Sequence, residues 1–363
     1  MPAGGRWAVL VAVSLLAGGV LQWVRLPGAV MLGPLAAAIV VQTAGGTVRV
    51  PRALMVAAQA VVGCLVAQAM TPAIVDGFVR EWPVFLAVVA LSVAAGAAIG
   101  WTMSRLRIIP GKGTAVWGML PGAATVMMVM AEEHGADFRL VAFMQYLRVV
   151  LVAAAASVVA VMFVRGEGGR FSAGLFPPVD PGNLAMTAVV ALAGAVLGRA
   201  SRIPAGVLLG PLVLGAVLNA LGEVRIEVPP ILLIASFALI GWNTGLRFTS
   251  DVLAAAARAL PQSVAATILL MAFCGIVAWG LVVLLHVDPL TAYLATSPGG
   301  MDAAAVIAAS TRVDMPFVMA LQAIRLMLLI LVGPTVARWV AGTLDRVPPD
   351  GEPPHPQDPG DLD

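Results

Sequence analysis

The sequence predicts an all-α polytopic membrane protein made of two homologous halves. Of its 363 residues, 60% are hydrophobic and only 11% are charged, whereas soluble domains carry about a quarter charged residues. Apolar runs long enough to cross a hydrocarbon core of about 30 Å recur along the whole chain. The runs do not alternate apolar and polar residues as the strands of a transmembrane β-barrel do. Several motifs also occur twice, in the same order.

This internal repeat is the strongest organisational signal. Four stretches return about 177 residues later: LPGAVMLGPL as IPAGVLLGPL, VPRALMVAAQAVVG as VPPILLIASFALIG, GMLPGAATVMMVMA as ATSPGGMDAAAVIA, and DFRLVAFMQYLR as DMPFVMALQAIR. We therefore expect a first membrane repeat over residues 1–172 and a second over 173–346. The tail, 347–363, is Pro-rich and acidic, and we expect it to be disordered.

Each half contains six apolar segments, which we expect to be helices. In chain order they lie near 7–24, 28–44, 53–72, 83–104, 110–131, 138–164, 183–200, 204–221, 229–247, 260–286, 289–310 and 315–341. The first is interpreted as a span rather than a cleaved signal peptide, because Gln22 and Trp23 resemble an interfacial helix end.

The fifth segment of each half is interrupted near its middle. Pro121 and Gly122 break the first, and Pro298, Gly299 and Gly300 break the second, because proline removes a helical hydrogen bond and glycine adds freedom. Either these segments are kinked helices that cross, or they re-enter on one side. If they re-enter, more of the Lys and Arg residues between segments lie on the cytoplasmic side, as the positive-inside rule favours.

The two alternatives give different architectures. With re-entrant segments the halves are inverted repeats with about ten spans and two broken segments, and both termini are cytoplasmic. With crossing segments there are about twelve spans and parallel repeats.

A carboxylate and two Gln-x-x-Arg pairs lie at membrane depth. Asp302 follows the second break and is interpreted either as a helix N-cap or as an ion or proton site. Arg148 with Gln145 and Arg325 with Gln322 lie about ten residues into their segments. Each arginine either hydrogen-bonds carbonyls of a broken helix, pairs with Asp302, or binds an anionic solute through its guanidinium fork.

The repeated LGP motifs, the Pro-Gly breaks and the two Q-x-x-R helices resemble the AbrB-type duplicated membrane protein family of Gram-negative bacteria. The resemblance covers about residues 7–341. SPGGMD fits the family pattern of an acidic residue after Pro-Gly-Gly, whereas LPGAATV departs from it. Members are often labelled regulators of gene expression or ammonia monooxygenases. The resemblance also places the family near cation/proton antiporters and bile-acid-type symporters.

The sequence features bear on three candidate functions: a transporter, a monooxygenase and a regulator. Inverted repeats, broken helices and buried charges favour a secondary transporter in the bacterial inner membrane, with a small solute and H⁺ or Na⁺ as partners in addition to the lipid bilayer. A membrane monooxygenase is disfavoured because the chain has only three histidines, so no enzyme activity, metal or cofactor is expected. Direct nucleic-acid binding is not expected either, so a regulatory role would be indirect. A homodimer is compatible with the sequence.

Overall fold

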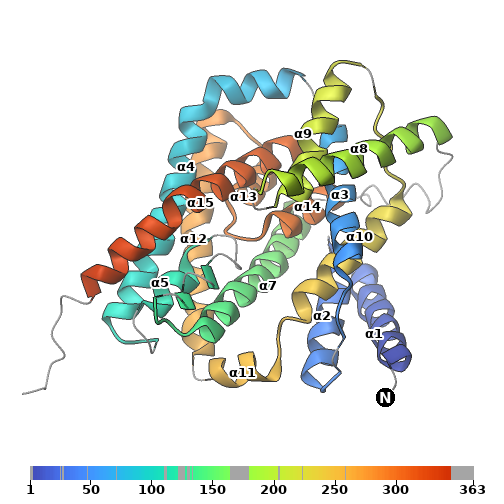
Figure 1. The fold of residues 1–363 in the computed structure, drawn as a ribbon. Coiled ribbons are helices and arrows are strands. Elements are labelled where there is room, and N and C mark those ends of the chain that lie inside the picture. Colours follow the sequence, from blue (N-terminus) through green and yellow to red (C-terminus); the bar gives the residue numbers. More distant parts are fainter. Residues whose placement is uncertain are drawn as a thin grey trace, which may run out of the picture.

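A computed structural model of the protein describes residues 3–344, except 25, 27, 47, 71, 110–112, 122–126, 129–130, 133, 164–179, 203–204, 223 and 258. Helices make up the elements of this part of the chain (Figure 1). They are α1 (Ala3–Trp23), α2 (Ala29–Thr43), α3 (Arg52–Ala69), α4 (Pro72–Arg105), α5 (Thr114–Met119), α7 (Phe138–Phe163), α8 (Pro181–Ala200), α9 (Gly206–Ala220), α10 (Pro230–Gly245), α11 (Ser250–Ala256), α12 (Leu260–Leu285), α13 (Pro289–Thr296), α14 (Met301–Ser310) and α15 (Met315–Leu344). The expected disordered tail, 347–363, lies outside the described residues.

The helices have the length and composition of membrane spans. Within the described residues, six are long and apolar enough to cross a bilayer, in α1, α3, α4, α7, α8 and α12. Shorter apolar helices lie at Ala29–Thr43, Gly206–Asn219, Pro230–Gly245 and Met315–Leu329. Large apolar side chains face outward, among them Leu15 at 73%, Leu192 at 70% and Ile276 at 71% exposure. A soluble monomer rarely exposes such continuous apolar surface, so the all-α prediction is confirmed and the helices agree with a polytopic membrane protein.

The structure adds helix to two regions outside the expected apolar segments. The apolar segment expected near 83–104 agrees with the apolar span Trp82–Arg105, but the helix α4 begins earlier, at Pro72. Residues 250–256, which lie between two of the expected apolar segments, form α11. Thr249 caps this helix by accepting a hydrogen bond from the Val252 N–H, a local signal that apolar periodicity does not detect.

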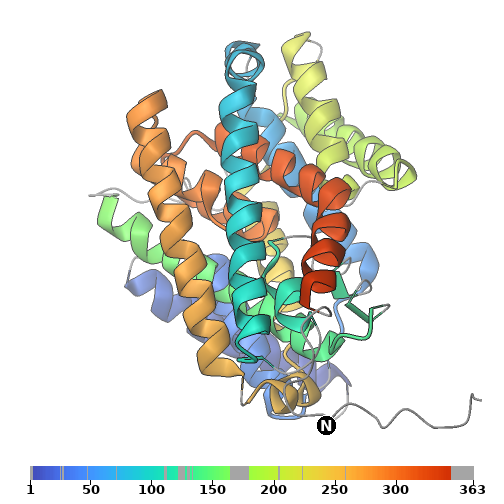
Figure 2. The same cartoon turned by 90° about the vertical axis from the view of Figure 1, so that its left-hand side faces the viewer.

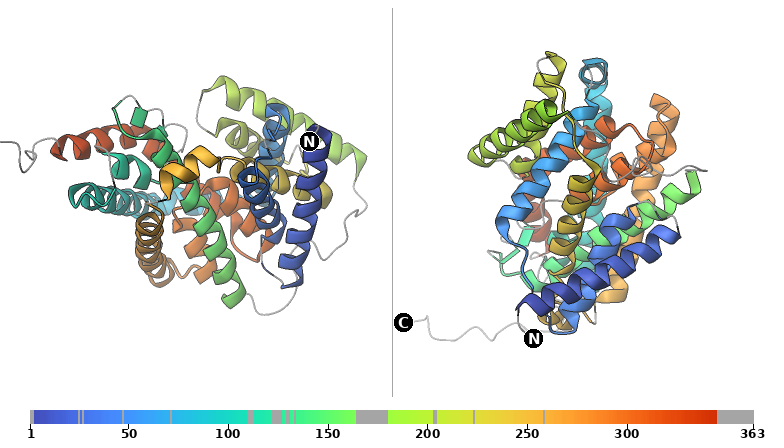
Figure 3. Two further views of the ribbon diagram at one scale, coloured as in Figure 1. Left: turned by 90° about the horizontal axis from the view of Figure 1, so that it is seen from below. Right: turned by 90° about the vertical axis from the view of Figure 1, so that its right-hand side faces the viewer.

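The helices form two groups, and each group takes helices from both sequence halves. In one group α1 packs on α2 and α8 on α9, while α2 packs on α10 and α3 on α9. In the other, α4 packs on α5 and α15, and α12 packs on α13. Viewed from below, Figure 3 shows α1, α3, α8 and α9 on one side and α4, α12 and α15 on the other. We call them the crossed bundle (α1–α3, α8–α10) and the broken-helix bundle (α4, α5, α7, α12–α15).

Close backbone approach holds the crossed bundle together at two matching points. A Cβ on Gly63 of α3 would collide with the Leu208 carbonyl and lie 3.1 Å from the Pro211 Cβ of α9. A Cβ on Gly241 of α10 would lie 2.5 Å from the Met31 carbonyl oxygen of α2. Glycine is therefore required at both positions, as at other close contacts between membrane helices.

The fourth segments of the two halves run in opposite directions. α4 and α12 lie side by side, and their colours follow the chain downward in α4 and upward in α12 (Figures 1 and 2). α7 climbs from the lower end of the molecule, whereas α15 descends towards it (Figure 1).

Candidate functional site

In the first half, a glutamine and an arginine of α7 hold the end of α5. The Gln145 Nε2 donates to the carbonyls of Trp117 at 2.9 Å and Leu120 at 3.0 Å. The Arg148 Nη1 donates to the carbonyls of Met119 and Leu120, both at 3.2 Å. The Arg148 Nη2 donates to the Gln145 Oε1. These bonds satisfy the carbonyls that a helix leaves without partners at its C-terminus.

The second half repeats this arrangement with different residues at the break. The Gln322 Nε2 donates to the carbonyls of Leu294 at 2.8 Å and Ser297 at 3.3 Å. The Arg325 Nη1 donates to the Ser297 carbonyl, and its Nη2 donates to the Gly299 carbonyl at 2.6 Å and to the Gln322 Oε1. The carbonyls contacted by the two glutamines have the same sequence separations, 28 and 25 residues, in both halves.

The glutamines replace the hydrogen bond that each proline removes. In a continuous helix, the N–H of residue 121 would reach the carbonyl of residue 117, and that of 298 the carbonyl of 294. Proline has no N–H. The carbonyls of Trp117 and Leu294 are those that Gln145 and Gln322 contact. The Pro-Gly break and the Q-x-x-R helix are therefore one structural unit, although they are about 25 residues apart in the chain.

The structure brings the two arginines together in the protein interior. Arg148 and Arg325 are 3% and 5% exposed, and Gln145 and Gln322 are 0% and 1% exposed. Val149 and Val152, which follow Arg148 on α7, lie against Gly300 and Gly299 of the second break, so the helix that carries Arg148 reaches both breaks. Two like charges in a low-dielectric interior repel strongly. The negative ends of the α5 and α13 dipoles offset part of that repulsion.

One nitrogen at this point has no protein partner. Among the described residues, the Arg148 Nε is a buried donor without a hydrogen bond. No described carboxylate forms an ion pair with either arginine, and no group of three described His, Cys, Asp or Glu residues could hold a metal ion. An unsatisfied buried charged donor is costly, so the site favours a negatively charged or acceptor-rich ligand.

The other predicted site residues lie at the breaks. Pro121 follows the C-cap of α5, Leu120, while Gly122 lies outside the described residues. Pro298 and Gly299 separate α13 from α14, and Gly300 is the N-cap of α14 without a side-chain cap.

The N-cap interpretation of Asp302 was wrong. Asp302 is the second helical residue of α14, because the extended conformation of Gly300 already begins the helix. The first turn of α14 still places the positive end of the helix dipole beside residue 302. The placement of the Asp302 side chain lies outside the described residues, so its pairing with Arg325 stays a prediction.

Three residues of the site were missed from the sequence. Thr114 and Thr291 accept hydrogen bonds from the N–H groups of Asp137 at 3.2 Å and Asp314 at 3.1 Å, which tie each broken segment to the start of α7 or α15. The sequence did offer a signal for the two threonines, because they occupy equivalent positions in the internal repeat. The backbone carbonyl of Cys274 in α12 accepts a hydrogen bond from the Thr296 Oγ1 at 3.2 Å, next to the second break. Nothing in an apolar run distinguishes it from a packing residue.

Comparison with known proteins matches residues 30–341 to the family described as "Transition state regulatory protein AbrB". A similar protein is "Putative regulator AbrB" of Escherichia coli (strain K12). It is 41% identical over 338 residues, which are 93% of this chain and 97% of that protein.

Proposed function

The chain belongs to the AbrB family, and from this premise we propose that it is a secondary transporter of a small anionic solute. The solute binds where Arg148 and Arg325 converge. Asp302, at the start of α14, loads H⁺ or Na⁺. No residue is assigned a catalytic role.

The observation that carries this proposal is the convergence of two buried guanidinium groups on the breaks of two helices. The arginines donate most of their hydrogen bonds to carbonyls at the helix breaks, so both arginines stabilise the interrupted helices. The unpartnered Arg148 Nε and the positive end of α14 remain to attract an anion. Interrupted helices that meet near charged residues are typical of solute sites in secondary transporters.

The proposal includes an inverted-repeat architecture. The matching contacts around the two breaks and the opposite directions of α4 and α12 support it. In this architecture the broken-helix bundle carries the solute, and it moves as a body against the crossed bundle.

The test is uptake of small carboxylates, phosphate and sulfate into proteoliposomes, with pH and Na⁺ gradients varied separately. We expect uptake of one anion to depend on one of the two gradients. Asp302→Asn should abolish the gradient dependence, and Arg325→Lys should lower uptake at least tenfold because lysine keeps the charge but loses the fork. Arg199→Lys, on the exposed face at the end of α8, is the matched control.

Lysine is preferred to glutamine at position 325 because a neutral residue would leave the break carbonyls without a charged donor and could unfold the site. Thermal unfolding of each variant separates loss of fold from loss of function. If folded Asp302→Asn and Arg325→Lys both kept the uptake and its gradient dependence, the site assignment would be wrong.

The name of the E. coli relative favours a second candidate, a role in regulating gene expression. We propose that such a role is indirect and acts through a transported solute or a membrane partner, since the described residues form apolar helices. Specific binding of promoter DNA by the purified protein would contradict this.

A further inference from the structure

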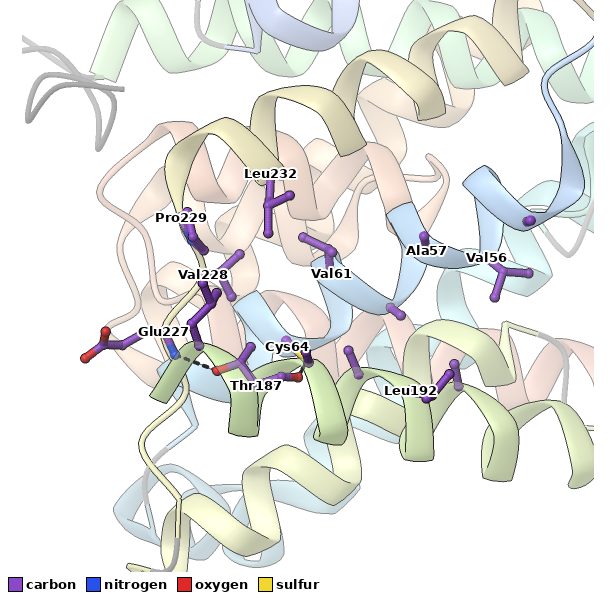
Figure 4. A pocket seen from close by; sticks show the side chains of 16 residues that line it. Val56, Ala57, Val61, Cys64, Thr187, Leu192, Glu227, Val228, Pro229 and Leu232 are labelled. Carbon is purple, nitrogen blue, oxygen red and sulfur yellow. Dashed lines mark hydrogen bonds between the residues drawn. The ribbon is translucent and has the colours of Figure 1, made fainter. Parts of the chain in front are cut away.

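An apolar groove of about 370 Å³ lies between α3, α8 and the start of α10, away from the broken helices (Figure 4). Small side chains create it. Ala57 and Ala60 of α3 face Ala188 and Ala191 of α8. Both helices are long and apolar enough to span a membrane, and Ala57 and Ala188 are exposed, so the groove opens towards the surroundings of the protein.

The groove has one charged end. Glu227, in the segment before α10, lies at this end with its side chain pointing away from the apolar walls (Figure 4). Its Oε1 accepts a hydrogen bond from the Asn183 Nδ2 at 2.9 Å, and its Oε2 accepts one from the Asp180 N–H at 3.3 Å. The Glu227 N–H donates to the Thr187 Oγ1 at 3.0 Å, which fixes the segment to α8.

The charges at this end have both signs. Asp180 is the N-cap of α8 and accepts from the N–H groups of Gly182 and Asn183, so two carboxylates lie at the mouth. Arg225, two residues before Glu227, is exposed. A ligand with an apolar chain and an ammonium group would match the apolar walls and the carboxylates.

We propose that this groove binds one acyl chain of a phospholipid with an amine headgroup, whose ammonium group lies against Glu227. An apolar groove at membrane depth does not hold water, and an empty one forfeits dispersion contacts along its walls. A lipid chain restores those contacts. The carboxylates attract an ammonium and repel the headgroup of an anionic lipid, so phosphatidylethanolamine binds more tightly than phosphatidylglycerol. The inference does not depend on the proposed transport activity.

The experiment adds dioleoyl phosphatidylethanolamine or dioleoyl phosphatidylglycerol to the delipidated full chain in detergent. Native mass spectrometry counts the retained lipid, and thermal unfolding measures stabilisation. We expect one retained phosphatidylethanolamine and a rise of several degrees in Tm, since a ligand that binds only the folded state raises Tm. The effect of phosphatidylglycerol should be clearly smaller.

Two kinds of variant separate the chain from the headgroup. Ala57→Phe and Ala188→Phe fill the groove and should lose the retained lipid, while Ala12→Phe, the same change on the exposed face of α1, should keep it. Glu227→Gln should keep a bound lipid but lose the preference for the amine headgroup. Retention in the filled variants, or an unchanged preference in Glu227→Gln, would overturn the proposal.

Discussion

At the scale of single residues, Pro121 and Pro298 each remove an N–H from a helix, and a glutamine from another helix supplies the missing donor. The arginine one turn later occupies the next carbonyls and orients the glutamine through its Oε1. The proline, glutamine and arginine are thus energetically coupled, although the sequence separates them.

This coupling leads to a prediction for Pro298 and Gln322. Gln322→Leu removes one of the two donors to each of the buried carbonyls of Leu294 and Ser297. The Leu294 carbonyl keeps the Ser297 Oγ and the Ser297 carbonyl keeps the Arg325 Nη1, so the free energy of unfolding should fall by about 1 kcal/mol. Pro298→Ala restores an N–H that can reach the Leu294 carbonyl. In that background Gln322→Leu should cost less, with a coupling energy of about 1 kcal/mol.

Denaturant unfolding of the four proteins of this cycle in detergent measures the coupling. The equivalent cycle with Pro121→Ala and Gln145→Leu is the matched comparison in the first half. Strictly additive costs in both halves would show that the glutamines do not replace the proline hydrogen bond.

At the scale of helices, the crossed bundle depends on backbone contact at several glycines, and Gly63 and Gly241 are two that join the halves. Gly63 of α3 lies against α9, and Gly241 of α10 lies against α2. Each contact joins the third segment of one half to the second segment of the other, so neither half can complete this bundle alone. The LGP motifs carry Pro34 and Pro211, which lie at these contacts.

Gly241→Val tests this interface. The Cβ of valine would meet the Met31 carbonyl oxygen at 2.5 Å and the Leu35 nitrogen at 3.1 Å, so the helices must separate. We expect a loss of about 1–3 kcal/mol or more, the usual range for overpacking. Gly280→Val on α12 is the control, because no atom lies within 4 Å of its added Cβ.

Thermal unfolding of the two variants in the same detergent gives the comparison. An equal Tm for Gly241→Val and Gly280→Val would contradict the close packing of α10 on α2.

At the scale of the whole molecule, the arrangement of the two bundles leads to a prediction about topology. Leu106 and Glu132 flank the first broken segment and are exposed, and Arg225 is exposed between α9 and α10. In the proposed inverted architecture, Leu106→Cys and Glu132→Cys react with a membrane-impermeant maleimide from one side of the membrane. Arg225→Cys reacts from the other side.

Labelling of intact cells and of inverted vesicles measures the sidedness. The native thiols, Cys64 and Cys274, are both buried, so the parent protein serves as the background control. Leu106→Cys and Glu132→Cys reacting from opposite sides would instead indicate crossing segments and parallel repeats.

The sequence by itself determined that the chain is an all-α membrane protein. A membrane span must be apolar and as long as the hydrocarbon core is thick, and both properties can be read from a single segment. It also located the breaks and the Q-x-x-R pairs, because proline, glycine and buried arginine leave a local signature. Only the tertiary structure decided that these features contact one another, that Gly300 rather than Asp302 is the N-cap of α14, and that the Cys274 carbonyl accepts a hydrogen bond from Thr296 beside the second break. Such contacts join residues far apart in the chain, and they depend on how helices from both halves cross and not on the composition of any one segment.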